Sequence, residues 1–218
     1  VGKYTGTGTA NLHINNMDAS YAGVYLCQVS GSCGNLNSDP ALLTVNANIA
    51  ISAQPTDKTA CPGTNVNFTV TATGTNLTYQ WQLNGIDIGG ATNSTLALTA
   101  VDATDAGSYK CRITGTCGSP FTNTASLTIL EAISIIAEPA NQQLCEVVND
   151  ANFTVTATGS SLVYQWKKNG VNMANGGNIL GALSANLTIS TITSADAGVY
   201  SCNITNSCGI SNTSPASL

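Results

Sequence analysis

A motif that recurs along the chain constrains its fold more than any other feature. The sequence Asp-Ala-Gly-x-Tyr-x-Cys occupies Asp105–Cys111 and returns at Asp196–Cys202, and a weaker copy that begins with Tyr occupies Tyr21–Cys27. Upstream of the two full copies, Tyr-Gln-Trp stands in the same frame, at Tyr79–Trp81 and Tyr164–Trp166. A set of motifs repeated at the interval of one small domain indicates a tandem array, in which each repeat is one structural unit.

The stretches between the motifs have the pattern of short β-strands. Apolar and polar residues alternate over Val66–Val70, which is the period of a strand with one buried face. Asn84-Gly85 and Asn169-Gly170 each follow a strand pattern, and they predict two-residue hairpins because both central residues of a type I′ turn need positive φ. The strands predicted for the first complete repeat are two edge strands at 49–51 and 58–60, followed by 66–70, 77–83, 96–98, 109–113 and 122–129.

The recurring motif and the upstream Trp together resemble the immunoglobulin-like β-sandwich. This resemblance implies that Trp81 and Trp166 fill the sandwich core. It also implies that Tyr109 and Tyr200 form tyrosine corners, in which the phenol hydroxyl bonds to backbone upstream. The expected fold is therefore all-β, with tandem immunoglobulin-like β-sandwich domains arranged head-to-tail.

The spacing of the motifs divides the chain into three segments. Residues 47–130 and 131–218 are each expected to form a sandwich, the second without the end of its last strand. Residues 1–46 are expected to hold only the last three strands of another sandwich. Residues 45–48 and 130–133 leave little free linker, which favours a stiff array. We therefore expect the chain to be part of a longer molecule.

The scarcity of charge argues against several classes of function. Only 8% of the residues are charged and the net charge is −5, whereas binding to nucleic acid or to anionic lipid needs clustered Lys and Arg. No apolar run is long enough to cross a membrane. The lone His13 has no neighbouring nucleophile, so we expect no enzyme activity. Scattered carboxylates and the lack of a Cys-x2-Cys pair predict no metal ion and no cofactor.

Eight cysteines in such a chain indicate an oxidising compartment. They form three sets by position in the repeat. The strand cysteines close the recurring motif. The first-turn cysteines stand just before the turn that leads into the strand predicted at 66–70 and into its counterpart in the next repeat. The hairpin-tip cysteines stand immediately before a Gly that follows the motif. The strand cysteines are Cys27, Cys111 and Cys202, the first-turn cysteines are Cys61 and Cys145, and the hairpin-tip cysteines are Cys33, Cys117 and Cys208.

The strand cysteines lack the partner that an immunoglobulin domain usually provides. That partner is a second cysteine on the facing strand, and the equivalent positions here hold Val70 and Val155. Cys111 and Cys202 are therefore expected to be buried free thiols that pack as small apolar groups.

The other two sets are expected at opposite ends of a sandwich. If the Gly after the hairpin-tip cysteine takes the left-handed conformation of a three-residue loop, the cysteine lies at the tip, away from the strand cysteine. In a head-to-tail array, the first turn of one domain then meets the hairpin of the next. The sequence accordingly predicts a disulfide between Cys61 and Cys208 that joins two domains.

The remaining exposed cysteines follow from the same scheme. Cys33, Cys117 and Cys145 would form disulfides with cysteines of repeats that lie outside residues 1–218. A different pairing stays open, in which Cys111 bonds Cys117 within one hairpin and the first-turn cysteines remain free.

A second resemblance concerns the kind of protein. The segments Gly63–Gly74, Tyr79–Trp81 and Asp105–Gly118 are similar to the bacterial immunoglobulin-like repeats of large secreted and cell-surface adhesin-type proteins, especially in gliding Bacteroidota. The resemblance covers nearly the whole chain. It implies export by the type IX route and an extracellular or cell-surface location.

These observations favour a structural and adhesive repeat segment of an extracellular surface protein or filament. Such a segment acts as a rigid stalk, or adds weak multivalent contacts, and its main partners are neighbouring repeats of the same long chain. One alternative is a module that binds a surface glycan or protein through hairpin loops or the inserted loop 174–184. Another is a spacer in a secreted enzyme. Neither nucleic-acid binding nor membrane insertion of this segment is expected.

Overall fold

A computed structural model describes residues 3–146 and 149–218 of the chain. Regular structure in these residues consists of short β-strands and three single-turn 3-10 helices. The predicted all-β fold of tandem sandwiches is thereby confirmed.

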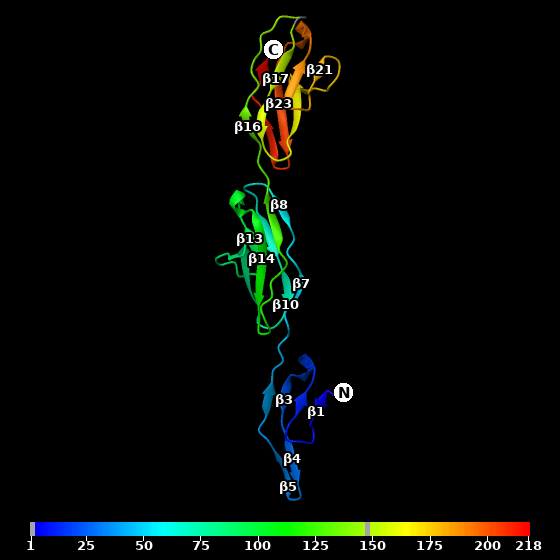
Figure 1. Cartoon of the computed structure of the whole chain (residues 1–218), viewed down its shortest axis with the longest axis vertical. Helices are drawn as coiled ribbons and strands as arrows, with labels where there is room; N and C mark the ends of the chain where they lie inside the picture. Colours follow the sequence, from blue (N-terminus) through cyan, green and yellow to red (C-terminus); the bar gives the residue numbers. More distant parts are fainter. Residues whose placement is uncertain (1–2, 147–148) are drawn as a thin grey trace. The chain divides into compact units, whose positions relative to one another are not determined.

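The segment after residue 47 forms a β-sandwich (Figure 1). A five-stranded sheet has the order β12-β11-β14-β15-β8, and the pairs β10-β7 and β13-β9 form smaller sheets. The pair β15-β8 is parallel, which matches an edge strand that has changed sheets. The elements are β7 (Ala50–Ala53), β8 (Lys58–Ala60), β9 (Val66–Thr69), β10 (Thr71–Thr73), β11 (Thr78–Leu83), β12 (Ile86–Asp87), β13 (Thr95–Leu98), η2 (Ala103–Asp105), β14 (Gly107–Thr114) and β15 (Ala125–Ile129).

The last segment forms a second sandwich of the same type. Its larger sheet has the order β20-β19-β23-β24, with β25 also paired to β23, and the other sheets are β17-β22-β21 and β16-β18. The elements are β16 (Ser134–Ala137), β17 (Ala151–Thr154), β18 (Thr156–Thr158), β19 (Val163–Lys168), β20 (Val171–Asn172), β21 (Ile179–Leu180), β22 (Asn186–Ile189), η3 (Ser194–Asp196), β23 (Val199–Asn206), β24 (Gly209–Asn212) and β25 (Ala216–Ser217).

The first segment contains six short strands, in the pairs β1-β2, β3-β6 and β4-β5. Of these, β1 precedes the region in which strands were expected. It is two residues long and carries no alternating pattern, so the sequence did not predict it. The elements are β1 (Tyr4–Thr5), β2 (His13–Ile14), η1 (Ala19–Tyr21), β3 (Gly23–Tyr25), β4 (Gln28–Gly31), β5 (Gly34–Asn37) and β6 (Ala41–Leu43).

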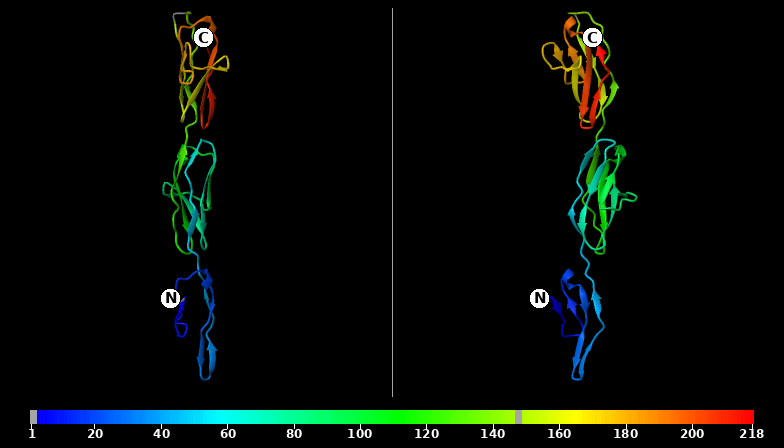
Figure 2. Two further views of the ribbon diagram at one scale, coloured as in Figure 1. Left: turned by 90° about the vertical axis from the view of Figure 1, so that its right-hand side faces the viewer. Right: turned by 180° about the vertical axis from the view of Figure 1, so that it is seen from behind.

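The turn after β1 has a counterpart in the insertion of the last segment. Gly6 and Gly181 have φ values of +79° and +77°, and a Cβ on either would lie about 2 Å from a carbonyl oxygen, that of Asn11 and of Asn186 respectively. Only glycine fits this close approach. The loop that includes β21 projects from the sandwich in both views of Figure 2. It contains a specific turn at Gly181.

Three aromatic rings fill the centre of each sandwich. Phe68 stacks on Tyr109 at a centroid distance of 4.7 Å and lies 6.2 Å from Trp81. The last segment repeats the arrangement at 4.7 Å and 6.1 Å. All six side chains are at most 1% exposed, and they are the largest fully buried side chains of their cores. The second set consists of Phe153, Tyr200 and Trp166.

The two predicted type I′ hairpins are confirmed by their backbone angles. Asn84 and Asn169 have φ values of 51° and 49°, and the glycines that follow have 86° and 81°. Each Asn side chain also accepts a backbone N–H from the strand beside the hairpin, that of Ser108 or of Val199, at 2.9 Å. Asn therefore satisfies the turn and ties it to the larger sheet.

A tyrosine corner precedes β23. The Tyr200 hydroxyl donates to the carbonyl oxygen of Asp196 at 2.5 Å. The Asp196 carboxylate in turn accepts the Thr193 N–H at 2.9 Å, which closes the 3-10 turn. Burial, with a smaller contribution from the Asp196 charge, raises the pKa of Tyr200 to about 12. The phenol is a structural donor in this position.

Candidate functional site

The described residues include a disulfide between Cys61 and Cys208. The two positions are 147 residues apart in sequence, with an S–S distance of 2.05 Å and a Cα–Cα distance of 5.4 Å. Residues 57–66 and 126–218 belong to one compact unit of the structure, and the bond lies inside this unit. A bond that joins such distant positions closes a long covalent loop.

The hairpin that carries Cys208 is tighter than the sequence predicted. Asn206 pairs with Gly209, so the loop consists of two residues, Ser207 and Cys208. Gly209 has a φ of 145°, and the glycines after Cys117 and Cys33 have 130° and 131°. The prediction of a three-residue loop with a left-handed Gly was therefore wrong, because the strands pair one residue closer to the tip. The cysteine nevertheless lies at the end of the hairpin.

Asn206 holds this tip against the backbone of Glu131. Its side-chain oxygen accepts the N–H of Cys208 at 2.8 Å, and its side-chain nitrogen donates to the carbonyl oxygen of Glu131 at 3.0 Å. The N–H of Glu131 donates to the Ser160 hydroxyl at 2.8 Å. These hydrogen bonds position the Cys208 backbone independently of the disulfide.

The turn that carries Cys61 is also held locally. The carbonyl oxygen of Cys61 accepts the Thr64 hydroxyl at 2.7 Å and the Thr64 N–H at 3.2 Å. Beside it, the N–H of Leu130 donates to the carbonyl oxygen of Ala60 at 2.9 Å. Both half-buried cysteines thus project from backbone that is already ordered.

The hairpin of Cys117 has the same loop length but a different anchor. Gly115 stands where the other hairpin has Asn206, and a Cβ on Gly115 would lie 2.9 Å from the carbonyl oxygen of Thr75, so an Asn does not fit. The N–H of Thr116 bonds that carbonyl at 3.0 Å instead. Cys117 is exposed and free, with its sulfur 3.7 Å from the carbonyl oxygen of Asn46.

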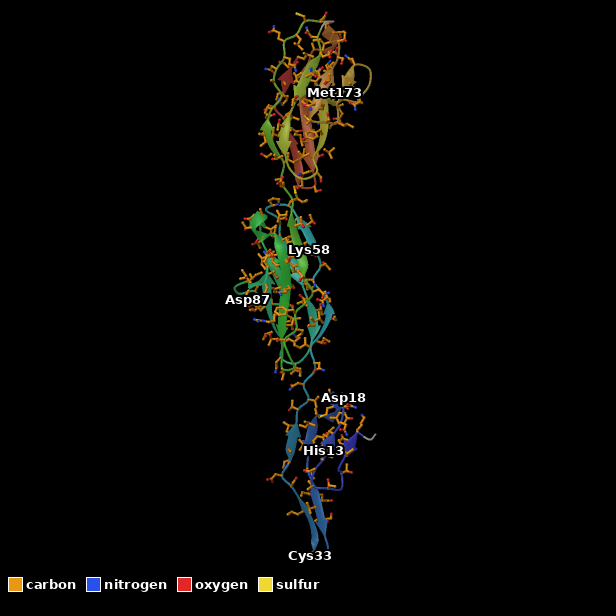
Figure 3. The ribbon with its side chains drawn as sticks, viewed as in Figure 1. His13, Asp18, Cys33, Lys58, Asp87 and Met173 are labelled. Atoms are coloured by element: carbon orange, nitrogen blue, oxygen red, sulfur yellow. A yellow bond between two sulfur atoms is a disulfide. The ribbon has the colours of Figure 1, made fainter. Side chains whose placement is uncertain are left out.

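The remaining thiols separate into exposed and buried groups. Cys33, at the end of the β4–β5 hairpin in Figure 3, is exposed and free, and so are Cys27 and Cys145. Cys111 and Cys202 are 0% exposed and free, in cores that also bury the two valines expected opposite them. The alternative bond between Cys111 and Cys117 is not formed in the structure: the first thiol faces the core and the second is exposed.

Burial makes two of the strand cysteines, Cys111 and Cys202, unreactive. It raises the pKa of Cys202 to about 11 and raises the pKa of Cys111 in the same direction. Because only the thiolate is nucleophilic, we expect iodoacetamide at pH 8 to label the four exposed free thiols in the folded chain and to leave Cys111 and Cys202 unmodified. The exposed free thiols are Cys27, Cys33, Cys117 and Cys145. Peptide mass spectrometry reads out the pattern, and the guanidinium-unfolded, reduced chain is the control in which all eight react. Rapid labelling of Cys202 in the folded chain would contradict the burial.

The structure adds little that could support catalysis. His13 lies on the short strand β2, shown in Figure 3. No group of three or more His, Cys, Asp or Glu side chains suited to a metal ion occurs in the part of the chain that the structure describes. Within the same residues, no helix is long and apolar enough to span a membrane.

One hollow, of about 520 Å³, lies on the first segment. Leu12, which is 46% exposed, is among the residues that line it, and its counterpart Leu187 in the last segment is 0% exposed. The hollow therefore lies over a face that is part of the core in the last sandwich.

A family model described as immunoglobulin domain matches residues 50–114 and 134–206. This chain belongs to the immunoglobulin-domain family. Solved structures of the family share the fold. The titin domains I67–I69, in an E-to-A variant, align with a TM-score of 0.73 at 18% identity over 100% of this chain and 82% of that one. Sidekick-1 immunoglobulin domains 1–4 align with a TM-score of 0.66 at 24% identity over 99% and 62%.

Curated members with similar sequence are much larger proteins. Protein sax-3 of Caenorhabditis elegans is 28% identical over 96% of this chain and 17% of its own length. Peroxidasin homolog of Mus musculus is 25% identical over 95% and 15%. Endoglucanase C of Cellulomonas fimi is 28% identical over 77% and 16%. This chain thus spans less than a fifth of these immunoglobulin-domain relatives.

Proposed function

We propose that this chain is a structural and adhesive repeat segment of an extracellular surface protein, in which disulfides clamp consecutive immunoglobulin domains. The bond between Cys61 and Cys208 is the observation that carries the proposal. A disulfide persists in an oxidising compartment, which suits an extracellular location. The family match over residues 50–114 and 134–206 supports a role as tandem immunoglobulin repeats of a larger protein.

In the finer form of the proposal, the segment is part of a stiff stalk. Cys33, Cys117 and Cys145 are exposed free thiols, and each would bond a cysteine of a neighbouring repeat in the way that Cys61 bonds Cys208. The resemblance to bacterial surface repeats favours export of the stalk through the type IX route and attachment to the cell surface.

Single-molecule pulling on the whole chain tests the clamp. With the bond intact, the residues between Cys61 and Cys208 are shielded from the applied force, so their contour length is not released. Reduction frees the 147-residue separation, which adds roughly 500 Å at about 3.4 Å per residue. We expect the fully extended oxidised chain to be shorter than the reduced chain by this length. The Cys61→Ser variant should reach the full extension without reduction.

The exposed Cys117 gives the matched control for this measurement. The Cys117→Ser variant keeps the disulfide and should show the same shorter extension when oxidised. An oxidised wild-type chain that extends to the full length of 218 residues would refute the clamp and with it the proposed role in a stiff stalk.

A spacer within a secreted enzyme is the second candidate. The match to endoglucanase C over 77% of this chain favours it. The sequence of the complete protein separates the candidates, since a catalytic domain on either side indicates a spacer and an extended series of similar repeats indicates a stalk.

A ligand-binding role of the inserted loop is also compatible with its surface. Leu180 and Leu183 are 62% and 61% exposed there. A Leu180→Ser, Leu183→Ser double variant that loses adhesion to a glycan or protein surface, while keeping the wild-type Tm, would favour this role.

A further inference from the structure

The outer face of the sheet β12-β11-β14 carries a cluster of charged and aromatic side chains. In the strand register Gln82 lies opposite both Asp87 and Lys110, and Arg112 is bridged to Phe121. Residues paired in this way point to the same side of a sheet. The neighbouring pair of Trp81 with Cys111 points into the core, so the cluster lies on the opposite, solvent side.

Contacts within the cluster hold its charges in place. The Arg112 guanidinium lies 3.6 Å from the Asp87 carboxylate, and the Gln82 amide donates to that carboxylate at 2.7 Å. The Lys110 ammonium lies 4.5 Å from the centre of the Phe121 ring, which is a cation–π contact. Arg112 and Asp87 remain 42% and 51% exposed, so the guanidinium has donors left for a ligand. Figure 3 shows Asp87 at the outer edge of this sandwich.

The last sandwich shows that the fold does not need this cluster. Its register is the same, with Trp166 opposite Cys202 and Gln165 opposite Asn203. At the positions of Lys110, Arg112 and Phe121 it has neutral polar residues without an aromatic ring. These are Ser201, Asn203 and Asn212.

Several acidic residues elsewhere serve a different purpose from Asp87. Asp102 accepts the Thr104 N–H and Asp57 the Ser126 N–H, each at 2.7 Å, and Glu138 accepts the Ser214 N–H at 2.9 Å. Such bonds stabilise turns and edges of the fold. Asp87 instead lies between a guanidinium and an amide on an open surface. The cluster ties β12 to its neighbours, but the last sandwich folds without it, and in a chain with so few charges it points to recognition of a ligand.

We infer that this face binds a carboxylated polysaccharide, of the uronic-acid type. Arg112, the chain's one arginine, and Lys110 provide donors for carboxylates, and the guanidinium geometry suits bidentate pairing. The 45% exposed ring of Phe121 offers an apolar surface for the C–H face of a sugar ring. Two cations in a chain of net charge −5 are too few for a nucleic-acid backbone. This activity is independent of the clamp.

Affinity electrophoresis of the whole chain in gels that contain polygalacturonate tests the inference. We expect the wild-type chain to be retarded by polygalacturonate and not by neutral dextran. The Lys110→Ser, Arg112→Asn double variant takes residues that the other sandwich already tolerates, so it should fold. Loss of two charge-assisted contacts should weaken retardation by about tenfold or more.

The pair Lys167 and Lys168 provides a control for net charge. A Lys167→Ser, Lys168→Ser variant removes two charges from the last sandwich and should bind like the wild type. The inference is overturned if the wild type shows no retardation, if both double variants lose binding equally, or if poly-glutamate competes as well as polygalacturonate does. The Cys61→Ser variant should bind normally, so failure of the clamp and failure of this site are distinguishable.

Discussion

Replacing Trp166 by Ala is expected to lower the free energy of unfolding of the last sandwich by about 3–5 kcal/mol. The ring is 0% exposed and lies 6.1 Å from the Phe153 ring, so its removal leaves a large cavity. The indole N–H also donates to the carbonyl oxygen of Ser184 at 2.8 Å, which anchors the end of the inserted loop. Urea denaturation with segment-resolved hydrogen exchange of β23 measures the effect.

An exposed residue of the same hairpin gives the control. Val171 is 70% exposed, and Val171→Ala should change the free energy of unfolding by no more than about 0.5 kcal/mol. Trp166→Phe should fall between the two, because it keeps part of the ring volume and loses the indole donor. Equal stability of Trp166→Ala and wild type would mean that the ring is not part of the core.

Removal of the disulfide is expected to have the second large effect. A bond that closes a 147-residue loop contributes about 3–5 kcal/mol in the chain-entropy model, less any strain. We expect Cys61→Ser to lower the free energy of unfolding by that amount and to lower Tm. Reduction of the wild-type chain by dithiothreitol should have the same effect. Non-reducing peptide mapping of the wild type should yield a peptide that joins Cys61 to Cys208.

Two variants separate the bond from its surroundings. Cys117→Ser changes a free thiol at the equivalent hairpin tip and should leave the unfolding free energy within about 0.5 kcal/mol of the wild type. Asn206→Ala removes the bonds to Cys208 and Glu131, so it should slow closure of the disulfide in a glutathione buffer. Detection of a disulfide between Cys111 and Cys117 by peptide mapping would contradict the pairing of Cys61 with Cys208.

Local sequence was sufficient for most of the secondary structure. Alternation over residues 66–70 predicted β9, and the Asn-Gly pairs predicted turns whose φ values are positive as required. These features depend on the period of a strand and on the sterics of single residues, which neighbours far along the chain do not alter. The repeated motif also predicted the tyrosine corner. This feature is local, because the hydroxyl of Tyr200 bonds the carbonyl oxygen of Asp196, four residues upstream.

Features that depend on pairing between strands were missed. The sequence predicted a three-residue loop at Cys208, but the register of Asn206 with Gly209 leaves two residues. It gave no sign of β1, whose identity as a strand comes from its pairing with β2. The face formed by Asp87, Lys110 and Phe121 was missed as well, since no sequence pattern links residues on three separate strands or loops.

The sequence by itself determined the class of each cysteine and the fold that contains it. Its motif placed Cys202 on a strand facing the core, and its turn residues placed Cys61 and Cys208 near chain reversals. Only the tertiary structure decided which of these sulfurs meet. A disulfide needs Cα atoms within about 7 Å, and a separation of 147 residues becomes 5.4 Å only after folded backbone has placed both turns.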